Sequence, residues 1–334
     1  MRIRSLTAFA ACLVAFAPRP AAAAEVEIKL GTLAPSGSAW HNILKEMGQK
    51  WSEVSGGQVK LRIFPGGVVG NEGDMVRKMR VGQLSAAALT TVGLHDITPE
   101  PQAVDVPLGI TSYEELDYIM GKVENELDKS LDDKGYVVLA WADIGFVHFF
   151  STRAIRTPAD MANAKLFAWD GDPASVEALK RAGFKPVVLS STDVIPSLQT
   201  GMIDTIASAP LYSLTSRIYQ KANKMSDLRW AILTGATIVK KEVWERVPAD
   251  LRPKLIDIAR QYGKRIDAEV RSINDDAIKQ MQKQGLEVIH ASDAAGWQAA
   301  ADAANRVVRG GVVPEKLFDE VMRYRDEYRA AHKK

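Results

Sequence analysis

Apolar and polar positions alternate in two short segments near the start of the chain, and helical spacing separates them. Residues 25–33 and 59–63 alternate, which predicts two strands. Between them, residues 40–54 place apolar side chains three or four positions apart, with Ser38 as a plausible N-cap and Gly56 as a plausible stop. A strand–helix–strand order predicts a parallel strand pair joined by a right-handed crossover.

The rest of the chain continues in strands and helices. Before residue 145 we predict a helix over 74–83, a strand over 84–92, a helix over 112–132 and a strand over 136–142. After it we predict strands over 165–169, 185–189 and 203–207, with helices over 172–183 and 192–200 between them, and long helices over 249–283, 295–308 and 314–332. Two lobes built from βαβ units predict an α/β hinged binding protein, with the ligand between the carboxyl ends of the strands.

The first 24 residues have the composition of a secretory signal. Arg2 and Arg4 precede the short apolar run of residues 6–17, and small residues follow it, which predicts cleavage just before Glu25. Cys12 lies in the apolar run, in the wrong context for a lipid-attachment cysteine. We therefore expect a soluble periplasmic protein rather than a lipoprotein.

Composition and charge exclude several kinds of function. The chain of 334 residues is 46% hydrophobic and 25% charged, which is ordinary for a globular protein of two lobes. Loss of the predicted signal removes three arginines and the single cysteine, which lowers the formal net charge from +2 to −1. Nucleic acid is therefore not an expected partner, and cysteine catalysis and cysteine-ligated metals are excluded.

Motifs of catalysis are absent from the sequence. It has no GxSxG, HExxH, GxxxxGK[ST] or GxGxxG motif, and no two of its five histidines have metal-ligand spacing. The glycine-rich loop 65–73 could offer backbone N–H groups to an anion, although a tight turn explains it as well. Asp143, Asp170 and Asp172 fall at predicted strand ends and could bind a cation or an amine, and Asp172 is better explained as a helix N-cap. We predict no cofactor, no metal and no enzymatic activity.

Four stretches, taken in order, resemble one family. KLGTLAPSGSAWHNILKEMGQKWSEVSGGQVKLRIFPGGVVGNEGDMVRKMRVGQL is similar to the opening of the solute-binding proteins of TRAP transporters of the DctP type. GFVHFFSTRAIRTPADMANAKLFAW, which reads as strand, turn and strand, is similar to their GFRxFTN…P.DM.G.K.R segment. SLQTGMIDTIASAP and VWERVPADLRPKLIDIA resemble their LQTG.VDG…P and W..LP...R..I...A segments.

The resemblance implies a two-lobed periplasmic-binding-protein fold whose discontinuous lobes close on a ligand in the cleft between them. It places residues 25–144 plus 233–272 in lobe I and residues 145–232 plus 273–334 in lobe II. It implies capture of a small solute in the periplasm and delivery to a TRAP permease made of a small and a large integral membrane subunit. Uptake in such systems is driven by an ion gradient.

The same resemblance raises a question about the ligand. In this family an arginine in the K.R strand typically binds a ligand carboxylate, often helped by the arginine of GFR, because a guanidinium pairs bidentately with a carboxylate. Phe167 and Val147 occupy these two positions here. An unpaired buried carboxylate would cost several kcal/mol. The receptor therefore uses another cation, with Arg77, Arg80 and Arg217 as candidates, or it binds a solute of apolar or aromatic character.

The resemblance also places an asparagine-like ligand contact of the LQTG…P segment at Ser208 or Ala209, and position in the predicted strands and loops supplies the other candidates. Trp141 and Trp169 have the alternative role of core residues beneath the cleft. The complete set of candidate ligand contacts is Trp40, His41, Asn71, Thr91, Trp141, Asp143, Val147, Phe167, Trp169, Asp170, Ser208 and Ala209. Two other functions stay open: a sensory binding protein that feeds a membrane receptor, and a secreted α/β enzyme, for which no catalytic constellation is visible.

Overall fold

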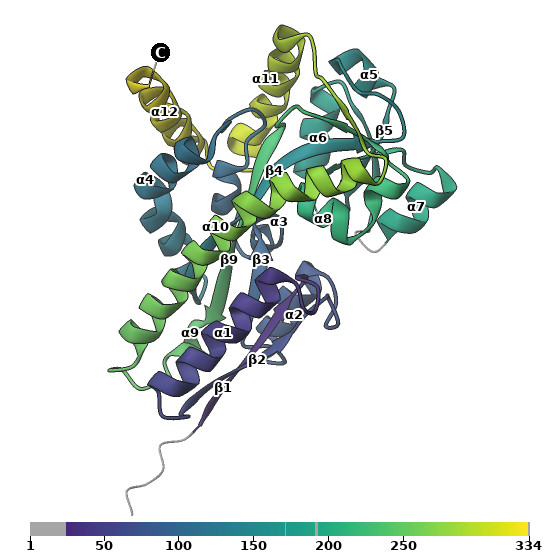
Figure 1. Ribbon diagram of the computed structural model, residues 1–334. Helices are drawn as coiled ribbons and strands as arrows, with labels where there is room; N and C mark the ends of the chain where they lie inside the picture. Colours follow the sequence, from purple (N-terminus) through teal and green to yellow (C-terminus); the bar gives the residue numbers. More distant parts are fainter. Residues whose placement is uncertain (1–24, 171, 191–192, 333–334) are drawn as a thin grey trace, which may run out of the picture.

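The computed structural model describes residues 25–170, 172–190 and 193–332 (Figure 1). The predicted signal segment and Cys12 lie outside the described residues. The described strands form a ten-stranded sheet with helices on its faces, and eight of its strands follow the order β2-β1-β3-β9-β4-β7-β5-β6. The predicted α/β class is confirmed.

The first lobe is built on the strands nearest the start of the chain. It contains β1 (Val26–Thr32), α1 (Ala39–Val54), β2 (Val59–Phe64), α2 (Glu72–Arg80), β3 (Ala86–Thr90) and α3 (Thr91–His95). β1 pairs in parallel with both β2 and β3, so the predicted βαβ unit is confirmed. Ser38 caps α1 as predicted, since its side chain accepts the His41 N–H.

The second lobe repeats this parallel arrangement. It contains β5 (Lys165–Trp169), α6 (Pro173–Arg181), β6 (Lys185–Leu189), α7 (Val194–Thr200) and β7 (Thr205–Ser208). β5 pairs in parallel with β6 and with β7. Asp172 caps α6 as predicted, and Gly201 ends α7 in a left-handed conformation.

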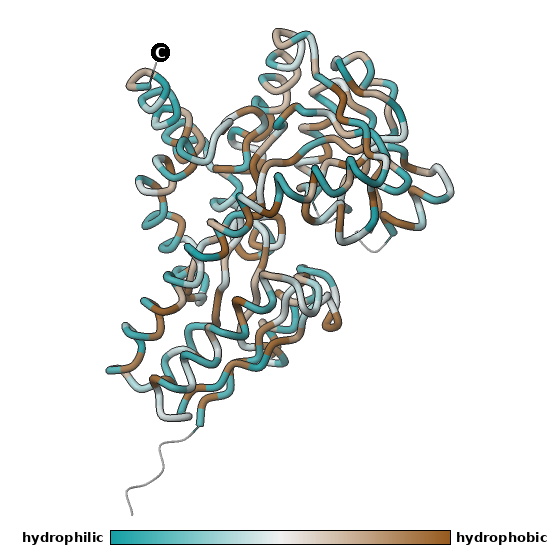
Figure 2. Tube along the Cα trace, in the orientation of Figure 1, coloured by the Kyte–Doolittle hydropathy of each residue, from teal (hydrophilic) through white to brown (hydrophobic). Residues whose placement is uncertain are grey.

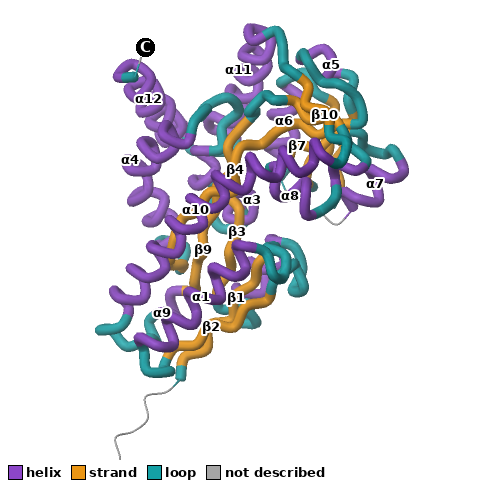
Figure 3. Tube along the Cα trace, in the orientation of Figure 1, coloured by secondary structure: helices purple, strands orange, loops and turns teal. Residues whose placement is uncertain are grey.

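Three long elements run from one lobe to the other (Figures 1 and 3). They are β4 (Tyr136–Ser151), β9 (Ala231–Lys240) and α10 (Arg252–Lys283). β4 pairs antiparallel with β9 from Tyr136 to Val147 and with β7 from His148 to Ser151. The prediction that the strand starting at 136 ends at 142 is therefore wrong. Register shifts at Val138/Ala140 and Asp143/Gly145 let one strand serve both lobes.

The remaining elements cover the sheet or extend its edges. They are η1 (Glu100–Val104), α4 (Tyr113–Asp132), α5 (Pro158–Ala162), α8 (Pro210–Thr215), η3 (Ile218–Gln220), β8 (Lys224–Ser226), α9 (Lys241–Trp244), β10 (Glu287–Ile289), α11 (Ala294–Gly311) and α12 (Glu315–Ala331). α5 was predicted as a turn, and a capping box between Thr157 and Asp160 makes it a short helix.

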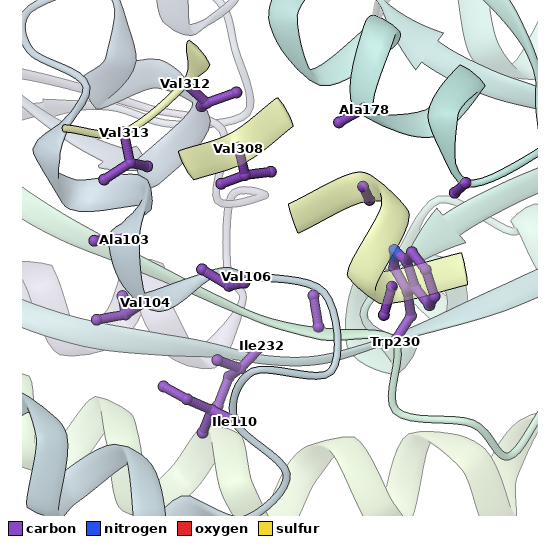
Figure 4. Packing of buried hydrophobic residues seen from close by; sticks show 14 of the residues in the cluster. Ala103, Val104, Val106, Ile110, Ala178, Trp230, Ile232, Val308, Val312 and Val313 are labelled. Atoms are coloured by element: carbon purple, nitrogen blue, oxygen red, sulfur yellow. The ribbon is translucent and has the colours of Figure 1, made fainter. Parts of the chain in front are cut away.

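Hydrophobic contacts gather in separate clusters in the two lobes. The largest joins α4 and η1 to α11, α12 and the aromatic side chains of Phe149, Trp230 and Trp297. Figure 4 shows part of it, with Ala103 and Val104 of η1 in the same group as Val308 and Val313. Figure 2 shows many apolar residues along the central strands and mostly polar residues along α12. The lobe boundaries at 144/145, 232/233 and 272/273 remain a prediction.

Candidate functional site

Val147 and Phe167, the two residues at the family's arginine positions, are both half-buried. Val147 lies in β4 opposite Ala231, and its carbonyl oxygen accepts the Trp230 N–H at 2.9 Å. Phe167 lies in β5 opposite Val187 and packs against the cluster formed around α7. β7 lies between β4 and β5 in the sheet. Val147 is therefore the last residue of β4 that pairs with β9, just before β4 begins to pair with β7, and Phe167 lies on β5 with β7 between its strand and β4.

The two tryptophans on the candidate list have different surroundings. The Trp141 indole N–H donates to Asp128 Oδ1 at 2.8 Å, and the ring packs against two core clusters. This arrangement favours the alternative role of Trp141 as a core residue. Trp169 is half-buried at the end of β5, and the next residue, Asp170, is exposed.

Asp143 is the candidate whose surroundings differ most from the expectation. It lies within β4 rather than at a strand end, and it is 6% exposed. Its Oδ2 lies 2.7 Å from Arg271 Nε, and Arg271 also binds both carboxylate oxygens of Asp117. The Asp143 backbone N–H donates to Asp267 Oδ1 at 2.7 Å. Asp143 is therefore held by α10, and a free cation-binding carboxylate is not what the structure shows there.

The pKa values of Asp143, Asp267 and Arg271 are shifted by burial and by the charges of their neighbours. Burial raises the pKa of Asp143 even though Arg271 is adjacent. Burial, together with the neighbouring Asp143 carboxylate, raises the pKa of Asp267 to about 7. Hydrogen bonding to Asp117 raises the pKa of Arg271, which therefore stays charged.

Four further candidates lie between residues 40 and 91, and three of them have local structural roles. His41 Nδ1 accepts the Gly37 N–H at 2.9 Å, and Asn71 caps α2 in a capping box with Asp74. Thr91 is 0% exposed, and its hydroxyl donates to Asp105. The half-buried Trp40 differs from these three because its indole nitrogen is buried and has no hydrogen-bond partner in the described part of the chain.

Two buried carboxyl groups near the end of β3 were not predicted. Asp105 accepts hydrogen bonds from the hydroxyls of Thr91 and Thr234, and burial raises its pKa to about 8. Glu72 accepts the Thr90 N–H at 2.6 Å and the Thr90 hydroxyl at 2.7 Å, and burial raises its pKa as well. Asp105 and Glu72 fall in no recognisable motif, so nothing in the local sequence indicates that they are buried.

Ser208 and Ala209 are both buried where β7 meets α8. Ser208 is 6% exposed and its hydroxyl donates to the Ala209 carbonyl at 3.1 Å, while Ala209 is the N-cap residue of α8.

Gln102 and Asp172, which are far apart in the sequence, form a hydrogen bond at the start of α6. Gln102 Nε2 donates to Asp172 Oδ2 at 3.4 Å, and Gln102 Oε1 is buried with no partner among the described residues.

The cations proposed as substitutes all lie near the surface. Arg77 pairs with Asp74 with 66% of its side chain exposed, Arg80 donates to the Asp96 carbonyl, and Arg217 is exposed. A further exposed guanidinium, Arg229, lies 4.4 Å from the ring centre of Phe146 and donates to the Thr111 carbonyl at 3.1 Å.

Two hollows of the described surface differ in their relation to the candidate contacts. One, of about 480 Å³, is lined by charged residues of α2, β9 and α9 and by the loop after α4. The other, of about 20 Å³, is lined by Tyr113, Phe146, His148, Arg229 and Asn274 among others. Phe146 and His148 lie on either side of Val147 in the sequence, and Pro210, which is also in the lining, follows Ala209. Burial lowers the pKa of His148 to about 4, so its ring is neutral at neutral pH.

The described ranges contain neither a candidate membrane-spanning helix nor a candidate metal cluster. No helix there combines the length and the apolar character needed to cross a membrane. No group of three or more histidine, cysteine, aspartate or glutamate side chains there is placed to hold a metal ion.

Two lobes joined by crossing strands and a shared long helix are the architecture of a hinged binding protein. The sequence profile of the DctP family, described as bacterial extracellular solute-binding protein, family 7, matches residues 30–309. The chain belongs to this family. The family is periplasmic and consists of solute-binding proteins rather than enzymes, so the predictions of a periplasmic, non-enzymatic protein are confirmed at that level.

Relatives and solved structures agree with this assignment. The 2,3-diketo-L-gulonate-binding periplasmic protein YiaO of Escherichia coli K12 is 25% identical over 336 residues, which cover 96% of this chain and 100% of that protein. A TRAP periplasmic solute-binding protein from Ralstonia eutropha H16 with bound (S)-2-acetolactate has a TM-score of 0.82 at 21% identity, covering 91% of this chain and 99% of the other. One from Desulfovibrio salexigens with bound orotic acid has a TM-score of 0.83 at 18% identity, covering 92% and 99%. The two-lobed fold is therefore confirmed.

Proposed function

We propose that the chain is the periplasmic receptor of a TRAP-type uptake system and binds a small organic acid between its lobes. The observation that carries this proposal is the family match over residues 30–309. Diketogulonate, acetolactate and orotate, which the relatives and solved neighbours bind, are all small organic acids. Export through a signal cleaved before Glu25 is part of the proposal.

We further propose that the solute has apolar or aromatic character next to its acid group. Phe167 and Val147 present carbon surface where the family resemblance places guanidinium groups, and Phe167 is half-buried rather than fully packed away. An aromatic wall favours a flat or apolar part of a ligand by stacking and by removal of apolar area from water. A simple dicarboxylate would lose a bidentate guanidinium contact at this place.

Native mass spectrometry of freshly purified protein tests the binding function without assuming a ligand. We expect a bound mass of a few hundred daltons or less, released on denaturation, from protein purified out of the periplasm. The released compound is then identified and titrated back by calorimetry. A protein that carries no such mass and gains no thermal stability from any member of an organic-acid panel would contradict the proposed function.

Substitution of Phe167 tests the apolar wall once the solute is known. Phe167→Ala should weaken binding by about 1–3 kcal/mol, as expected for loss of a buried aromatic contact. Val188→Ala is the matched control, because Val188 is on the neighbouring strand β6 and 48% exposed. Equal affinities of the two variants would place Phe167 outside the binding site.

Delivery to a permease is tested by transport. The receptor is co-expressed with candidate small and large TRAP membrane subunits, and uptake of the identified solute is measured in cells lacking other receptors. We expect uptake only when receptor and permease are both present. Binding without any receptor-dependent uptake would leave a binding protein and remove the permease from the proposal.

A further inference from the structure

One face of α10 holds the irregular part of β4. Asp267, Arg271 and Asn274 are spaced four and three residues apart, so they lie on the same side of the helix. The Asp267 carboxylate accepts the Asp143 N–H at 2.7 Å, and Arg271 Nε lies 2.7 Å from Asp143 Oδ2. We call these three helix residues, with the β4 segment 143–145, the α10–β4 clasp.

The last member of the clasp fits the strand irregularity closely. Asn274 Nδ2 donates to the Ile144 carbonyl at 3.1 Å, and its Oδ1 accepts the Leu211 N–H of α8 at 3.0 Å. Gly145 has a φ of +122°, and a Cβ at this position would lie 2.3 Å from Asn274 Nδ2. The glycine therefore makes room for the side chain that ties the helix to the strand and to the second lobe.

The clasp lies on the elements that both lobes share. β4, β9 and α10 each extend from one lobe to the other (Figure 1), so any change in the angle between the lobes must bend or shift them. The register of β4 against β9 shifts at Asp143/Gly145. A bulge in a strand is a place where backbone direction can change at low cost. The grip of α10 on this place limits how the lobes can move.

The charges in the clasp do not balance. The carboxyl groups of Asp143, Asp267 and Asp117 surround a single guanidinium, that of Arg271. The Tyr113 ring lies against Arg271 with 4.6 Å from the guanidinium carbon to the ring centre. The charges that act on Asp267 are those of Asp143 on β4, Asp117 on α4 and Arg271 on α10 itself. α1, which also packs against this part of α10, contributes the apolar side chains of Ile43 and Trp40. Loss of a proton from Asp267 therefore adds a negative charge beside Asp143 with no new cation to offset it.

We propose that the proton on Asp267 controls the relative position of the two lobes by holding α10 against the bulge of β4. With the proton bound, the helix and the bulge stay together as the structure shows them. Without it, burial of the ionised Asp267 carboxylate and its repulsion from Asp143 outweigh the stronger hydrogen bond from the Asp143 N–H, which favours arrangements that separate helix and strand. Since Asp267 has a pKa of about 7 here, this change falls in the physiological pH range. The proposal concerns the ligand-free protein, so it stands or falls separately from the proposed ligand.

Distance measurement between spin labels on the two lobes tests this proposal. Val81, just after α2, and Met202, just after α7, are 70% and 53% exposed and can carry the labels as cysteines. The single cysteine of the sequence, Cys12, lies in the predicted signal, so protein that begins at Glu25 has no other thiol to label. Pulsed electron–electron double resonance is recorded without ligand at about pH 5.5 and about pH 8.5, on either side of the titration of Asp267.

We expect one main distance at the lower pH and a second population at the higher pH. If the two arrangements differ by one unit in the pKa of Asp267, the ratio of populations changes about tenfold. Asp267→Asn, which keeps an acceptor for the Asp143 N–H and cannot ionise, should keep the low-pH distance at both values. Asp257→Asn is the control, since Asp257 is an exposed aspartate on the same helix and should respond like the unmodified protein. A distance distribution that does not change with pH, or an Asp267→Asn variant that responds as strongly as the control, would overturn the proposal.

Discussion

Removal of the Arg271 guanidinium should be among the most destabilising single changes outside the hydrophobic core. Arg271 pairs with Asp143 at 2.7 Å, and the side chains are 27% and 8% exposed. Arg271→Met keeps much of the side-chain length but leaves the Asp143 carboxylate buried without a cation. The hydrogen bond from the Asp143 backbone N–H to Asp267 and the bulge of β4 would remain in place, so the Asp143 carboxylate cannot simply move into water.

The magnitude follows from the two ion pairs that Arg271 makes. Loss of one partner of a buried pair costs about 3–5 kcal/mol, because the remaining charge stays desolvated. The second partner, Asp117, is 58% exposed, and its pair with Arg271 adds up to about 1 kcal/mol. We therefore expect Arg271→Met to lower the free energy of unfolding by about 3–5 kcal/mol near pH 8. Loss of the cation also raises the pKa of Asp143 further, so the cost should shrink as the pH falls and the carboxyl group takes up a proton.

Urea unfolding followed by circular dichroism measures this change at about pH 8 and about pH 5. Arg265→Met is the matched control, because Arg265 is on the same helix and pairs with Glu46 at 2.7 Å with both side chains about half exposed. We expect the control to cost less than about 1 kcal/mol. The double variant Asp143→Asn, Arg271→Met should recover part of the lost stability, since the unpaired Asp143 charge is then removed as well. A cost for Arg271→Met no larger than that of the control would refute this account of the clasp.

Three further changes have expected outcomes. Asp105 has a pKa of about 8, above its value in the unfolded chain, so its cost to stability grows as the pH rises from about 4 to 8, and Asp105→Asn should flatten that decline in unfolding curves. His148 has a pKa of about 4, below its unfolded value, so its contribution is present above about pH 6.5 and is lost as the pH falls toward 4; His148→Gln should remove this loss, and an unchanged pH profile would contradict it. Gly145→Ala should cost more than about 2 kcal/mol by urea unfolding, because the φ of +122° and the close Asn274 amide leave no room for a Cβ, and a neutral result would mean that the bulge relaxes freely.

Most of the helices and strands could be predicted because their apolar periodicity is local. The βαβ unit of the first lobe and the strand–helix alternation of the second both follow from spacing and capping residues, as with Ser38 and Asp172. The capping box of α5 was also visible in the sequence as Thr157 followed by Asp160 three residues later. A five-residue helix contains too few apolar positions for a helical period to be recognised in the sequence.

The long crossing strand could not be predicted for a physical reason. Residues 136–142 read as one buried strand, and the stretch that begins at Gly145 reads as the start of another. In the structure the glycine is a bulge in one strand, and its conformation depends on Asn274, far away in the sequence. Which carboxylates are buried depends on such partners too: Arg271 lies 128 residues from Asp143, and no local pattern links them.

The candidate ligand contacts were only partly resolved by the structure. Trp141 and Thr91 have hydrogen-bond partners within the protein, and Asp143 is taken up by Arg271. Val147 and Phe167 keep the half-buried apolar positions from which the prediction about the solute came. The sequence could indicate what is missing at these positions, but it could not indicate which other group meets the acid.

Calorimetric titration of the purified, ligand-stripped protein with succinate, alongside the solute recovered from the native protein, is the most direct test of the central claim. A receptor whose usual arginine positions hold a valine and a phenylalanine should bind the recovered solute with a dissociation constant in the micromolar range or below, and should show no heat of binding for succinate at the same concentrations. Micromolar binding of succinate would show that a cation of the protein pairs with the succinate carboxylate, and would contradict the apolar character proposed for this site.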